Sequence, residues 1–580
     1  YFNDPDLNGD GIGVDINLAT GEAIDGWGNT DTLTHIQAVS GSDYRDTLLG
    51  SDSNEGFLGT LGNDSIDGSG GWDWVSYAWL NNEEGFKGVN IDLGGNIATG
   101  LDSEAIPLFT DTLFNIEEVE GSRFSDAIQG NAADNWLSGW EGDDHIIGGE
   151  GYDTLVGGQG DDIIEGALFD GNSPQNNANY QDDPGGITAQ IYYDSSDSYN
   201  SFDGSNVIDG WEDIDILINI ARIKGSNYDD QITINIDDLF DTDDTSWHIW
   251  GNGGSDTITG TAGEMVSAMY FDDPSGVNID LSTGIAHDGW GGTDTLTDIY
   301  AVSGSDYGDD SLIGSSGDNG FYGSFGDDLI NGGDGYDWID YGWLDGDENF
   351  SYIKLDFDPT EDYMTVTAYD SEESVLFSDT LYNIESFQGT SGEDIFAGNN
   401  EDNWFSGEAG ADLLKGNGGN DVFNFTDSSS IDSVLDFTTG EENDVLRFDE
   451  SNGLNFHAQG GYDIYTSAMN SDPVDPTAYK IVGVTVTVSD WLNVASVING
   501  AVDAGSGDGT DDGTYFVVSN GEEGRVYYWE GDTNPNNDSI DNTVDEYELT
   551  HFVNLDQFGN DDILSLSDVN FQIDFHPGAV

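Results

Sequence analysis

A nine-residue repeat runs between Gly121 and Gly166 and constrains the fold more than any other feature of the chain. Three residue classes keep a strict register in it: a carboxylate or its amide (Asp126, Asn135, Asp144, Asp153, Asp162), an aliphatic residue (Ile128, Leu137, Ile146, Leu155, Ile164) and a glycine (Gly130, Gly139, Gly148, Gly157, Gly166). A period of nine matches neither the 3.6 residues of an α-helical turn nor the alternation of an isolated strand. It predicts a turn plus a short strand, stacked into a solenoid.

Four further arrays carry the repeat elsewhere in the chain. Three keep the nine-residue step: Asp46, Glu55, Asp64, Asp73; Asp310, Asn319, Asp328, Asp337; and Asp394, Asn403, Asp412, Asp421. The remaining array is broken, with one nonapeptide at Asp230, another ending at Asp256, and an acidic insertion around Asp237 to Ser246 between them. We expect it to hold less metal.

Each array follows a recurrent segment in which an aspartate lies ten residues before a glycine, as in Asp111 to Gly121, with further copies starting at Asp31, Asp294 and Asp379 and a looser one at Asp215. Alternating stretches such as 14–18, 89–93 and 277–281 lie upstream and have the period of a β-strand. We therefore divide the chain into five strand-rich units and a tail, with boundaries at 1–77, 78–167, 168–267 (irregular), 268–341, 342–425 and 426–580.

The segment 157–165, Gly-Gly-Gln-Gly-Asp-Asp-Ile-Ile-Glu, matches the pattern G-G-x-G-x-D-x-U-x. The chain therefore resembles the RTX (repeats-in-toxin), hemolysin-type family of calcium-binding β-roll proteins. The resemblance implies an all-β fold of parallel β-roll arrays alternating with short strand segments. It also implies that six residues of each nonapeptide form a metal-binding turn and three form a strand. The calcium ligands carried over are Asp46, Asp64, Asp73, Asp126, Asp144, Asp153, Asp162, Asp256, Asp310, Asp328, Asp337, Asp394, Asp412 and Asp421.

In such rolls two nonapeptides complete one coil, and calcium lies between turns 18 residues apart. The resemblance thus pairs Asp126 with Asp144, Asp144 with Asp162, Asn135 with Asp153, Asp46 with Asp64, Glu55 with Asp73, Asp310 with Asp328, Asn319 with Asp337, Asp394 with Asp412 and Asn403 with Asp421. One ion per pair gives roughly nine ions, if the Asn- and Glu-substituted turns also bind.

The charge of the chain supports metal binding at these positions. It has 116 acidic against 10 basic residues, a net charge of −106, 36% hydrophobic residues and no cysteine. Two carboxylates about 5 Å apart repel by roughly 3 kcal/mol at an effective dielectric constant of about 20. Calcium, which prefers oxygen ligands, would remove this repulsion. A merely solvated acidic surface is the alternative, but solvation does not explain the register.

Two other acidic loops are weaker candidates. Residues 4–11 have the alternating oxygens of an EF-hand loop, although the twelfth position is Asp15 and no flanking helix is apparent. Residues 532–538 are more degenerate and are typical of an Asx-rich turn. Aromatic residues also recur beside the ligand positions, at Trp72, Trp74, Trp136, Trp338 and Trp404. Stacking within the chain, a contact with a neighbouring molecule and sugar binding are all open for these rings.

The sequence indicates no catalytic site. Its seven histidines are dispersed, and it has neither an H-E-x-x-H nor a G-x-S-x-G motif. A carboxylate dyad of the glycosidase kind stays open, because acids are so numerous. We expect no enzyme, no nucleic-acid binding, because of the charge, and no apolar segment that spans a membrane.

The segments 433–437 and 443–448 resemble the part that caps RTX rolls, and 561–571 resembles the C-terminal signal of type I secretion. Tyr1 corresponds to a position inside a repeat, so we expect the chain to be a piece of a longer protein. The interpretation is a secreted, calcium-binding structural protein that forms a surface layer, filament or matrix as a homopolymer. The alternatives are a folding and export module of a larger secreted enzyme, toxin or adhesin, and a binder of cell-surface glycans.

Overall fold

The computed structural model describes residues 1, 11–166, 176–193, 205–236, 246–347, 349–359, 363–426, 432–435 and 444, and the backbone of strands at 168–169, 173–174, 445–448, 482–485, 514–519, 523–529 and 549–556. The chain divides into two compact units: unit 1 comprises 1–273 and 284–302, and unit 2 comprises 274–283 and 303–580. The described elements are β-strands and two short 3-10 helices, η1 (Ala78–Asn82) and η2 (Gly342–Gly346). This confirms the all-β prediction.

Unit 1 contains two sheets, here called sheets A and B. Sheet A consists of β1 (Ile12–Asn17), β2 (Glu22–Ile24), β3 (Thr30–Thr32), β5 (Arg45–Leu49), β7 (Ser65–Asp67), β9 (Val89–Asp92), β10 (Ile97–Leu101), β11 (Pro107–Phe114), β13 (Ala127–Gln129), β15 (His145–Ile147), β17 (Ile163–Glu165), β21 (Thr188–Tyr193), β22 (Asn206–Ile208), β23 (Ile214–Ile218), β25 (Gln231–Ile236), β27 (Thr257–Thr259), β30 (Ile285–His287) and β31 (Asp294–Thr297). Sheet B consists of β4 (Ala38–Ser40), β6 (Gly56–Leu58), β8 (Trp74–Ser76), β12 (Glu118–Ser122), β14 (Trp136–Glu141), β16 (Thr154–Gln159), β20 (Asn177–Asn179), β24 (Arg222–Lys224), β26 (Trp247–Trp250), β28 (Val266–Met269) and β32 (Ala301–Ser303). A separate short hairpin joins β18 (Leu168–Phe169) and β19 (Ser173–Pro174).

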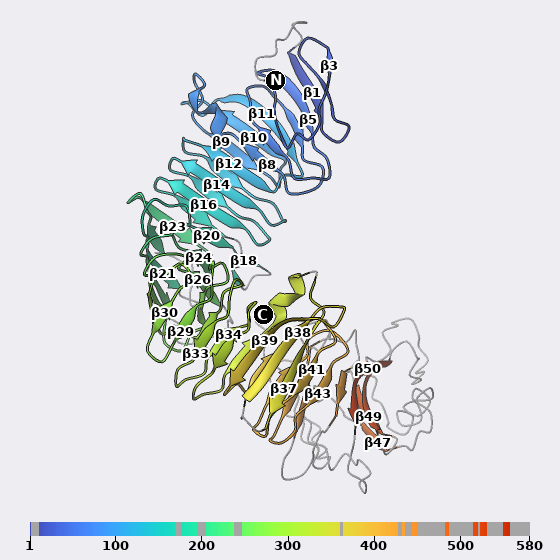
Figure 1. Ribbon diagram of the computed structural model, residues 1–580. Helices are drawn as coiled ribbons and strands as arrows, with labels where there is room; N and C mark the ends of the chain where they lie inside the picture. Colours follow the sequence, from blue (N-terminus) through green and yellow to red (C-terminus); the bar gives the residue numbers. More distant parts are fainter. Residues whose placement is uncertain are drawn as a thin grey trace, which may run out of the picture. The chain divides into compact units, whose positions relative to one another are not determined.

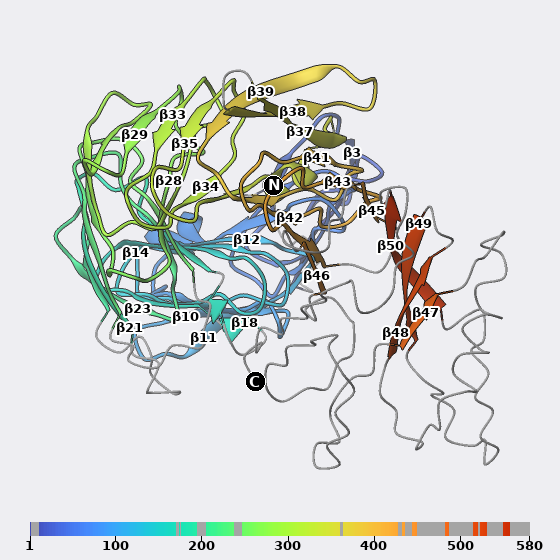
Figure 2. The same ribbon diagram turned by 90° about the horizontal axis from the view of Figure 1, so that it is seen from below.

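Successive nonapeptides alternate between the two sheets, so that one coil takes two repeats. In sheet A, Ile128 pairs in parallel with Ile146, and Ile146 pairs with Ile164. In sheet B, Leu137 pairs with Leu155. One coil therefore contains 18 residues, as predicted. Figure 1 shows β12, β14 and β16 stacked rung upon rung, and Figure 2 shows β12 and β14 on the opposite side of the coil from β10 and β11.

The core lies between the two sheets and repeats the aliphatic series of the sequence. Ile128, Leu137, Ile146, Leu155 and Ile164 are all buried. Each three-residue strand points only its middle side chain inward, as the burial patterns of β13, β15 and β17 show. One large apolar residue per nonapeptide is therefore enough to fill the coil, which explains how a chain with few hydrophobic residues keeps a continuous core.

Antiparallel meanders interrupt sheet A between the arrays. The chain leaves β8 for β9, returns along β10, and then runs along β11, which pairs in parallel with β7 of the preceding array. Next to the meander, β9 pairs in parallel with β13 of the following array. The strands β21, β22 and β23 form the same arrangement between β25 and β17. In sheet B, by contrast, the parallel pairing of β6, β8, β12, β14, β16 and β20 is uninterrupted.

Unit 2 repeats this design. Its sheet A contains β29 (Asn278–Asp280), β33 (Ser311–Ile313), β35 (Leu329–Asn331), β37 (Tyr352–Asp358), β38 (Tyr363–Tyr369), β39 (Val375–Tyr382), β41 (Ile395–Ala397), β43 (Leu413–Lys415) and β45 (Asp432–Val434). Its sheet B contains β34 (Gly320–Tyr322), β36 (Trp338–Asp340), β40 (Ser386–Gln388), β42 (Trp404–Ser406), β44 (Val422–Phe425) and β46 (Val445–Phe448). The meander β37–β38–β39 lies between β41 and β35.

Strands continue toward the C-terminus in β47 (Val482–Thr485), β48 (Thr514–Ser519), β49 (Glu523–Trp529) and β50 (Leu549–Asp556). Of the two segments expected to cap the roll, 432–434 and 445–448 are strands that extend sheets A and B. The expected secretion signal at 561–571 and the loop at 532–538 lie outside the described residues. Residues 4–10 of the EF-hand-like loop also lie outside them.

Candidate metal centre

The structure brings together all nine pairs of turns that the 18-residue register predicts. In each pair, the backbone N–H of the earlier residue donates a hydrogen bond of 2.7 to 2.9 Å to Oδ1 of the later aspartate. Asp126 thus donates to Asp144, and Asp144 donates to Asp162. A column of carboxylates therefore runs along the turns of each array. Their role as calcium ligands stays a prediction.

The first aspartate of every array has both carboxylate oxygens occupied by protein donors. Asp126, for example, accepts the N–H of Val89 and the hydroxyl of Ser122 on Oδ1, and the N–H of Ser122 on Oδ2. The same arrangement holds for Asp46 with Ser42, Asp230 with Ser226, Asp310 with Ser305 and Asp394 with Thr390. The chain's own N–H and hydroxyl groups thus already satisfy both oxygens of these five carboxylates.

Among the later aspartates, Asp64 and Asp328 accept a hydroxyl on Oδ2, from Thr60 and Ser324. Oδ2 is buried and has no hydrogen-bond donor in five others: Asp73, Asp144, Asp162, Asp256 and Asp337. A buried carboxylate oxygen without a donor is costly unless a cation satisfies it. These five turns therefore fit a calcium ion best. The sequence held part of this distinction in the serine or threonine four or five residues before each satisfied aspartate, although Ser69 precedes Asp73 in the same way.

A glycine at the fourth position of most turns makes the close stacking possible. Gly160 has a φ of +142°, and a Cβ atom there would lie 1.8 Å from the carbonyl oxygen of Gly142 in the coil before. Successive turns are therefore in backbone contact, which places carbonyl oxygens beside the carboxylates. Among the described residues, no three His, Asp or Glu side chains gather to form a metal site by themselves. Calcium here would need backbone carbonyl ligands as well as aspartate, and calcium accepts both.

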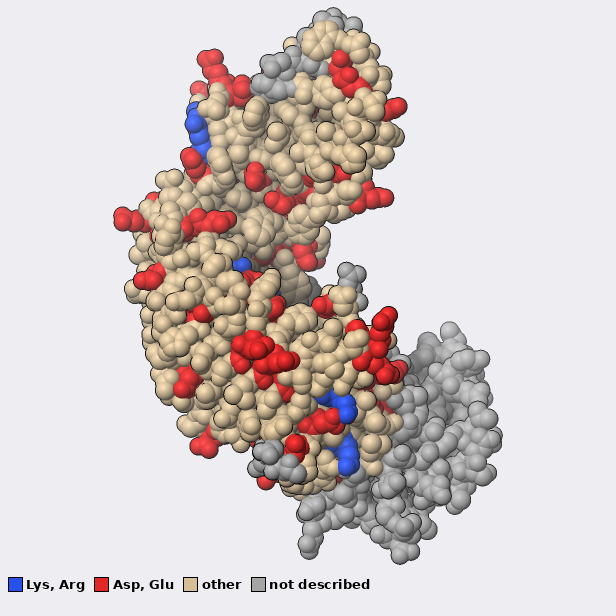
Figure 3. All heavy atoms as spheres, in the orientation of Figure 1, with Lys and Arg blue, Asp and Glu red and all other residues tan. Residues whose placement is uncertain are grey.

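Burial and mutual repulsion act on these carboxyl groups. Burial, followed by the charge of Asp126, raises the pKa of Asp144 to about 9. Burial also raises the pKa of Asp256 to about 9, and the neighbouring charges of Asp294 and Asp230 contribute. The calcium-free turns therefore favour the protonated form, and a divalent cation would supply the missing counter-charge. Figure 3 shows acidic side chains in scattered groups on the visible face and few basic ones, so few cationic side chains lie near to neutralise them.

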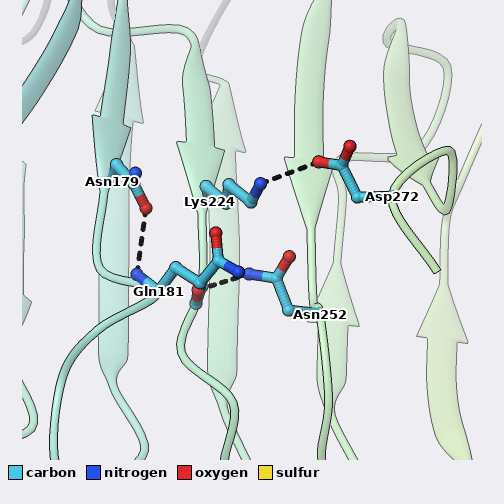
Figure 4. Close-up of polar contacts among 6 residues, drawn as sticks. Asn179, Gln181, Lys224, Asn252 and Asp272 are labelled. Atoms are coloured by element: carbon cyan, nitrogen blue, oxygen red, sulfur yellow. Dashed lines mark hydrogen bonds and ion pairs between the residues drawn. The ribbon is translucent and has the colours of Figure 1, made fainter. Parts of the chain in front are cut away.

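The broken array contains two side-chain contacts with charged or amide donors. Asn252 donates from Nδ2 to the carbonyl oxygen of Gly225 at 2.5 Å, and Lys224 pairs with Asp272 at 2.7 Å (Figure 4). Asp230 and Asp256 still stack, although 26 residues separate them. Asn417 of a regular array makes the same contact with the carbonyl oxygen of Gly398 at 2.6 Å, so a lower metal content of the broken array stays a prediction.

The recurrent aspartate that precedes each array is itself a rung of the stack. Asp111 accepts the N–H of Asp64 on Oδ1 and the hydroxyl of Tyr77 on Oδ2, both at 2.9 Å. The pairs Tyr270–Asp294 and Tyr341–Asp379 repeat this contact at 2.9 and 2.6 Å, and the hydroxyl of Tyr1 donates to Asp31 at 3.0 Å. The sequence showed these aspartates and tyrosines, but the meander that joins them could not be read from it.

The tryptophans beside the ligands divide into two groups. Trp74 and Trp338 lie against Gly56 and Gly320, where a Cβ atom would be 2.1 Å from either ring, so they pack within the chain. Trp72 and Trp136 expose 37% and 38% of their surface, and Trp72 donates from its indole to Glu118. The second group is the more exposed, since Trp74 and Trp338 are partly buried.

Comparison with known proteins places the turns in a family. The family description of the RTX calcium-binding nonapeptide repeat matches residues 49–82, 120–155, 141–171, 248–264, 305–339 and 388–423, which fall in all five arrays but leave out Asp46 and Asp230. The chain carries RTX calcium-binding repeats. RTX nonapeptide repeats bind Ca²⁺, so calcium is the metal of these arrays.

Other comparisons add little to the RTX assignment. No curated protein is detectably similar in sequence. Among solved structures, the extracellular lipase LipA from Serratia marcescens is similar at 15% identity and a TM-score of 0.17, over 48% of this chain and 42% of the lipase. The match thus spans less than half of either chain and carries no argument. In the described part of the chain, no helix is long and apolar enough to cross a membrane.

Proposed function

We propose that this RTX chain is a secreted structural protein that folds on binding calcium and assembles with copies of itself into an extracellular layer, filament or matrix. It acts without catalysis. The observation that carries the first part is the column of buried carboxylates, five of which keep an oxygen without a donor. In a chain with a net charge of −106, the neighbouring carboxylates of each column repel one another until a cation binds between them.

Secretion is supported by the repeat family and by the calcium requirement. RTX proteins are typically exported, and extracellular calcium modules commonly have dissociation constants of about 10⁻⁴ to 10⁻³ M. At the far lower calcium of a cytosol, such a chain would stay expanded through self-repulsion. Folding would therefore follow export.

Exposed aromatic side chains support self-assembly. Trp27, Trp79, Trp140 and Trp290 each expose close to half of their surface, and Tyr307 exposes 69%. Aromatic residues supply much of the energy of protein interfaces, because they bury a large apolar area at a small entropic cost. Many exposed rings on a rigid, repetitive scaffold suit contacts between copies.

Electron microscopy and light scattering with and without calcium test the proposal. We expect ordered assemblies in calcium, and their loss in a variant with Trp27, Trp79 and Trp290 changed to serine. The matched control changes Trp74 and Trp338, which pack within the chain. Monomers alone at saturating calcium would contradict self-assembly but leave calcium-driven folding intact.

The alternative is a folding and export module of a larger secreted enzyme, toxin or adhesin. The uninterrupted pairing of sheet B favours a passive scaffold of this kind, since calcium binding would rigidify it as a whole. Sequencing the complete gene tests it, and a catalytic or pore-forming segment beside the repeats would favour this alternative.

A further inference from the structure

The meanders end the arrays in two different ways. Two of them place a phenylalanine two residues before the aspartate that continues the stack: Phe109 before Asp111 and Phe377 before Asp379. Both rings are buried, and they stack on Tyr77 and Tyr341 with centroids 6.0 and 6.4 Å apart. These array ends are closed by an apolar plug.

The other two meanders place an acidic loop at the same point. The loops begin Asp209-Gly210-Trp211 and Asp288-Gly289-Trp290. Each lies on the last nonapeptide turn before it: Ile214 donates to Asp161, and Thr293 donates to the hydroxyl of Ser255. The second loop, Gly289-Trp290-Gly291-Gly292-Thr293-Asp294, even keeps the glycines and the aspartate of a nonapeptide turn.

The leading aspartates of these loops are buried and half satisfied. Asp288, 6% exposed, accepts the N–H groups of Gly291 and Gly292 on Oδ1, both at 2.6 Å, whereas its Oδ2 has no donor. Asp209, 3% exposed, accepts the N–H groups of Trp211 and Asp213 on Oδ1, and its Oδ2 also has no donor. Both loops therefore leave one buried carboxylate oxygen without a donor, although their sequences differ after the tryptophan.

The free oxygen of Asp288 converges with a backbone oxygen of the array. A Cβ atom on Gly292 would lie 1.5 Å from the carbonyl oxygen of Gly254 and 2.6 Å from Oδ2 of Asp288. Both oxygens therefore crowd one point at the junction. The in-register aspartate of this rung, Asp294, cannot serve there, because Asp256 and Tyr270 occupy its two oxygens.

The array aspartate that hydrogen-bonds to the meander aspartate differs between the two kinds of end. Beside the phenylalanine plugs, Thr60 and Ser324 donate hydroxyl groups to Oδ2 of Asp64 and Asp328. Beside the acidic loops, Oδ2 of Asp162 and Asp256 has no donor. Among these four junctions, an unpaired Oδ2 on the array aspartate occurs only where the loop aspartate is present.

We propose that Asp209 and Asp288 each complete an additional calcium site with the last nonapeptide turn before their loop, using a carboxylate from outside the repeat pattern. At the second site the ligands are Oδ2 of Asp288 and the carbonyl oxygen of Gly254, with Oδ2 of Asp256 as the further carboxylate of that turn. Asp183 and Asp273 hold the loops in place by accepting the N–H groups of Gly210 and Gly289.

The related loop at Asp25 lacks the free carboxylate oxygen of the other two loops. Asn29, at the position of Gly292, donates its side-chain amide to both oxygens of Asp25. No carboxylate oxygen of Asp25 is left over. We assign no ion to this copy.

Counting bound calcium in the full chain at saturation tests the site. We expect D209N and D288N each to lose one ion, and the double variant to lose two. D102N is the matched control, because Asp102 also accepts two N–H groups of its own loop but belongs to a plugged meander, and it should lose none. An unchanged count in D209N and D288N would overturn the inference. D144N is the positive control, because losing an ion there shows that the count detects a single calcium ion bound by the repeats.

A second measurement needs no variant. In a crystal of the unaltered chain grown with calcium, we expect an anomalous peak between Oδ2 of Asp288 and the Gly254 carbonyl oxygen, and none beside Phe109 or Phe377. A water molecule or an empty space at that point would sink the proposal even if D288N failed to fold. The site concerns the array ends alone and does not rest on self-assembly.

Discussion

Oδ1 of Asp162 accepts the backbone N–H of Asp144 at 2.7 Å, while Oδ2 of the same carboxylate is buried without a donor. Oδ1 thus joins two successive coils, and Oδ2 is available to bind a cation. Because the arrays repeat this arrangement, calcium should bear on the fold of the whole chain.

Removing calcium should unfold the arrays. Neighbouring carboxylates at about 5 Å repel by roughly 3 kcal/mol at an effective dielectric constant of about 20, and each array repeats the repulsion. We expect far-ultraviolet circular dichroism to lose its β-sheet signal in chelator and to regain it with a midpoint of about 10⁻⁴ to 10⁻³ M calcium. A spectrum that does not change on chelation would contradict calcium-dependent folding.

Asp144→Asn and Asp126→Asn should behave differently. Asp144 has a free oxygen, so D144N should raise the calcium midpoint of folding by roughly three- to tenfold, equivalent to about 1 kcal/mol. Asp126 is already saturated by Val89 and Ser122, so D126N should weaken the fold with little change in the number of bound ions. Calorimetric titration separates the two effects, and equal loss of ions in both variants would refute the distinction.

Gly160→Ala should destabilise the roll by about 1 to 3 kcal/mol, because its backbone conformation and its contact with Gly142 both exclude a Cβ atom. Gly317 lies at the same position of the Asn319 turn and has only Ser315 at 3.9 Å. G317A should therefore be nearly neutral. Urea unfolding in saturating calcium measures both, and similar midpoints for the two variants would count against the stacking argument.

Tyr341→Phe should cost about 1 to 3 kcal/mol, since it leaves an oxygen of the fully buried Asp379 without its donor. Tyr307→Phe is the control, because Tyr307 is exposed. Thermal unfolding in calcium compares them. Equal stability of the two variants would show that the hydroxyl contact contributes nothing.

Acid should stabilise the calcium-free protein. The pKa of Asp144 and that of Asp256 are raised to about 9, far above the unfolded value of about 3.9, so protonation favours the fold. This contribution is complete below about pH 4 and is lost as the pH rises through about 9. In chelator, we expect the β-sheet signal in far-ultraviolet circular dichroism, absent at about pH 8, to return as the pH falls to about 5, whereas calcium affinity should fall over the same range. A calcium-free signal that does not increase on acidification would contradict this sign.

The sequence predicted the parts of the fold that depend on neighbours within one or two repeats. The pairing of Asp126 with Asp144 follows from the nine-residue period alone, because a solenoid converts sequence spacing directly into rise. The contact of Asp64 with Asp111, 47 residues apart, could not be predicted, because it depends on the path of a whole meander. For the same reason the role of Asp288 was hidden: its sequence is that of an ordinary turn, and only the fold places it against Gly254.

The meanders have a consequence for the lengthening of the chain. Each of them departs from sheet A and rejoins it in register, while sheet B continues unbroken beside it. A unit inserted or deleted as a whole would therefore preserve every pairing on either side. Such a protein can gain or lose length in modular steps, and genes of this kind can drift in unit number without passing through a misfolded intermediate.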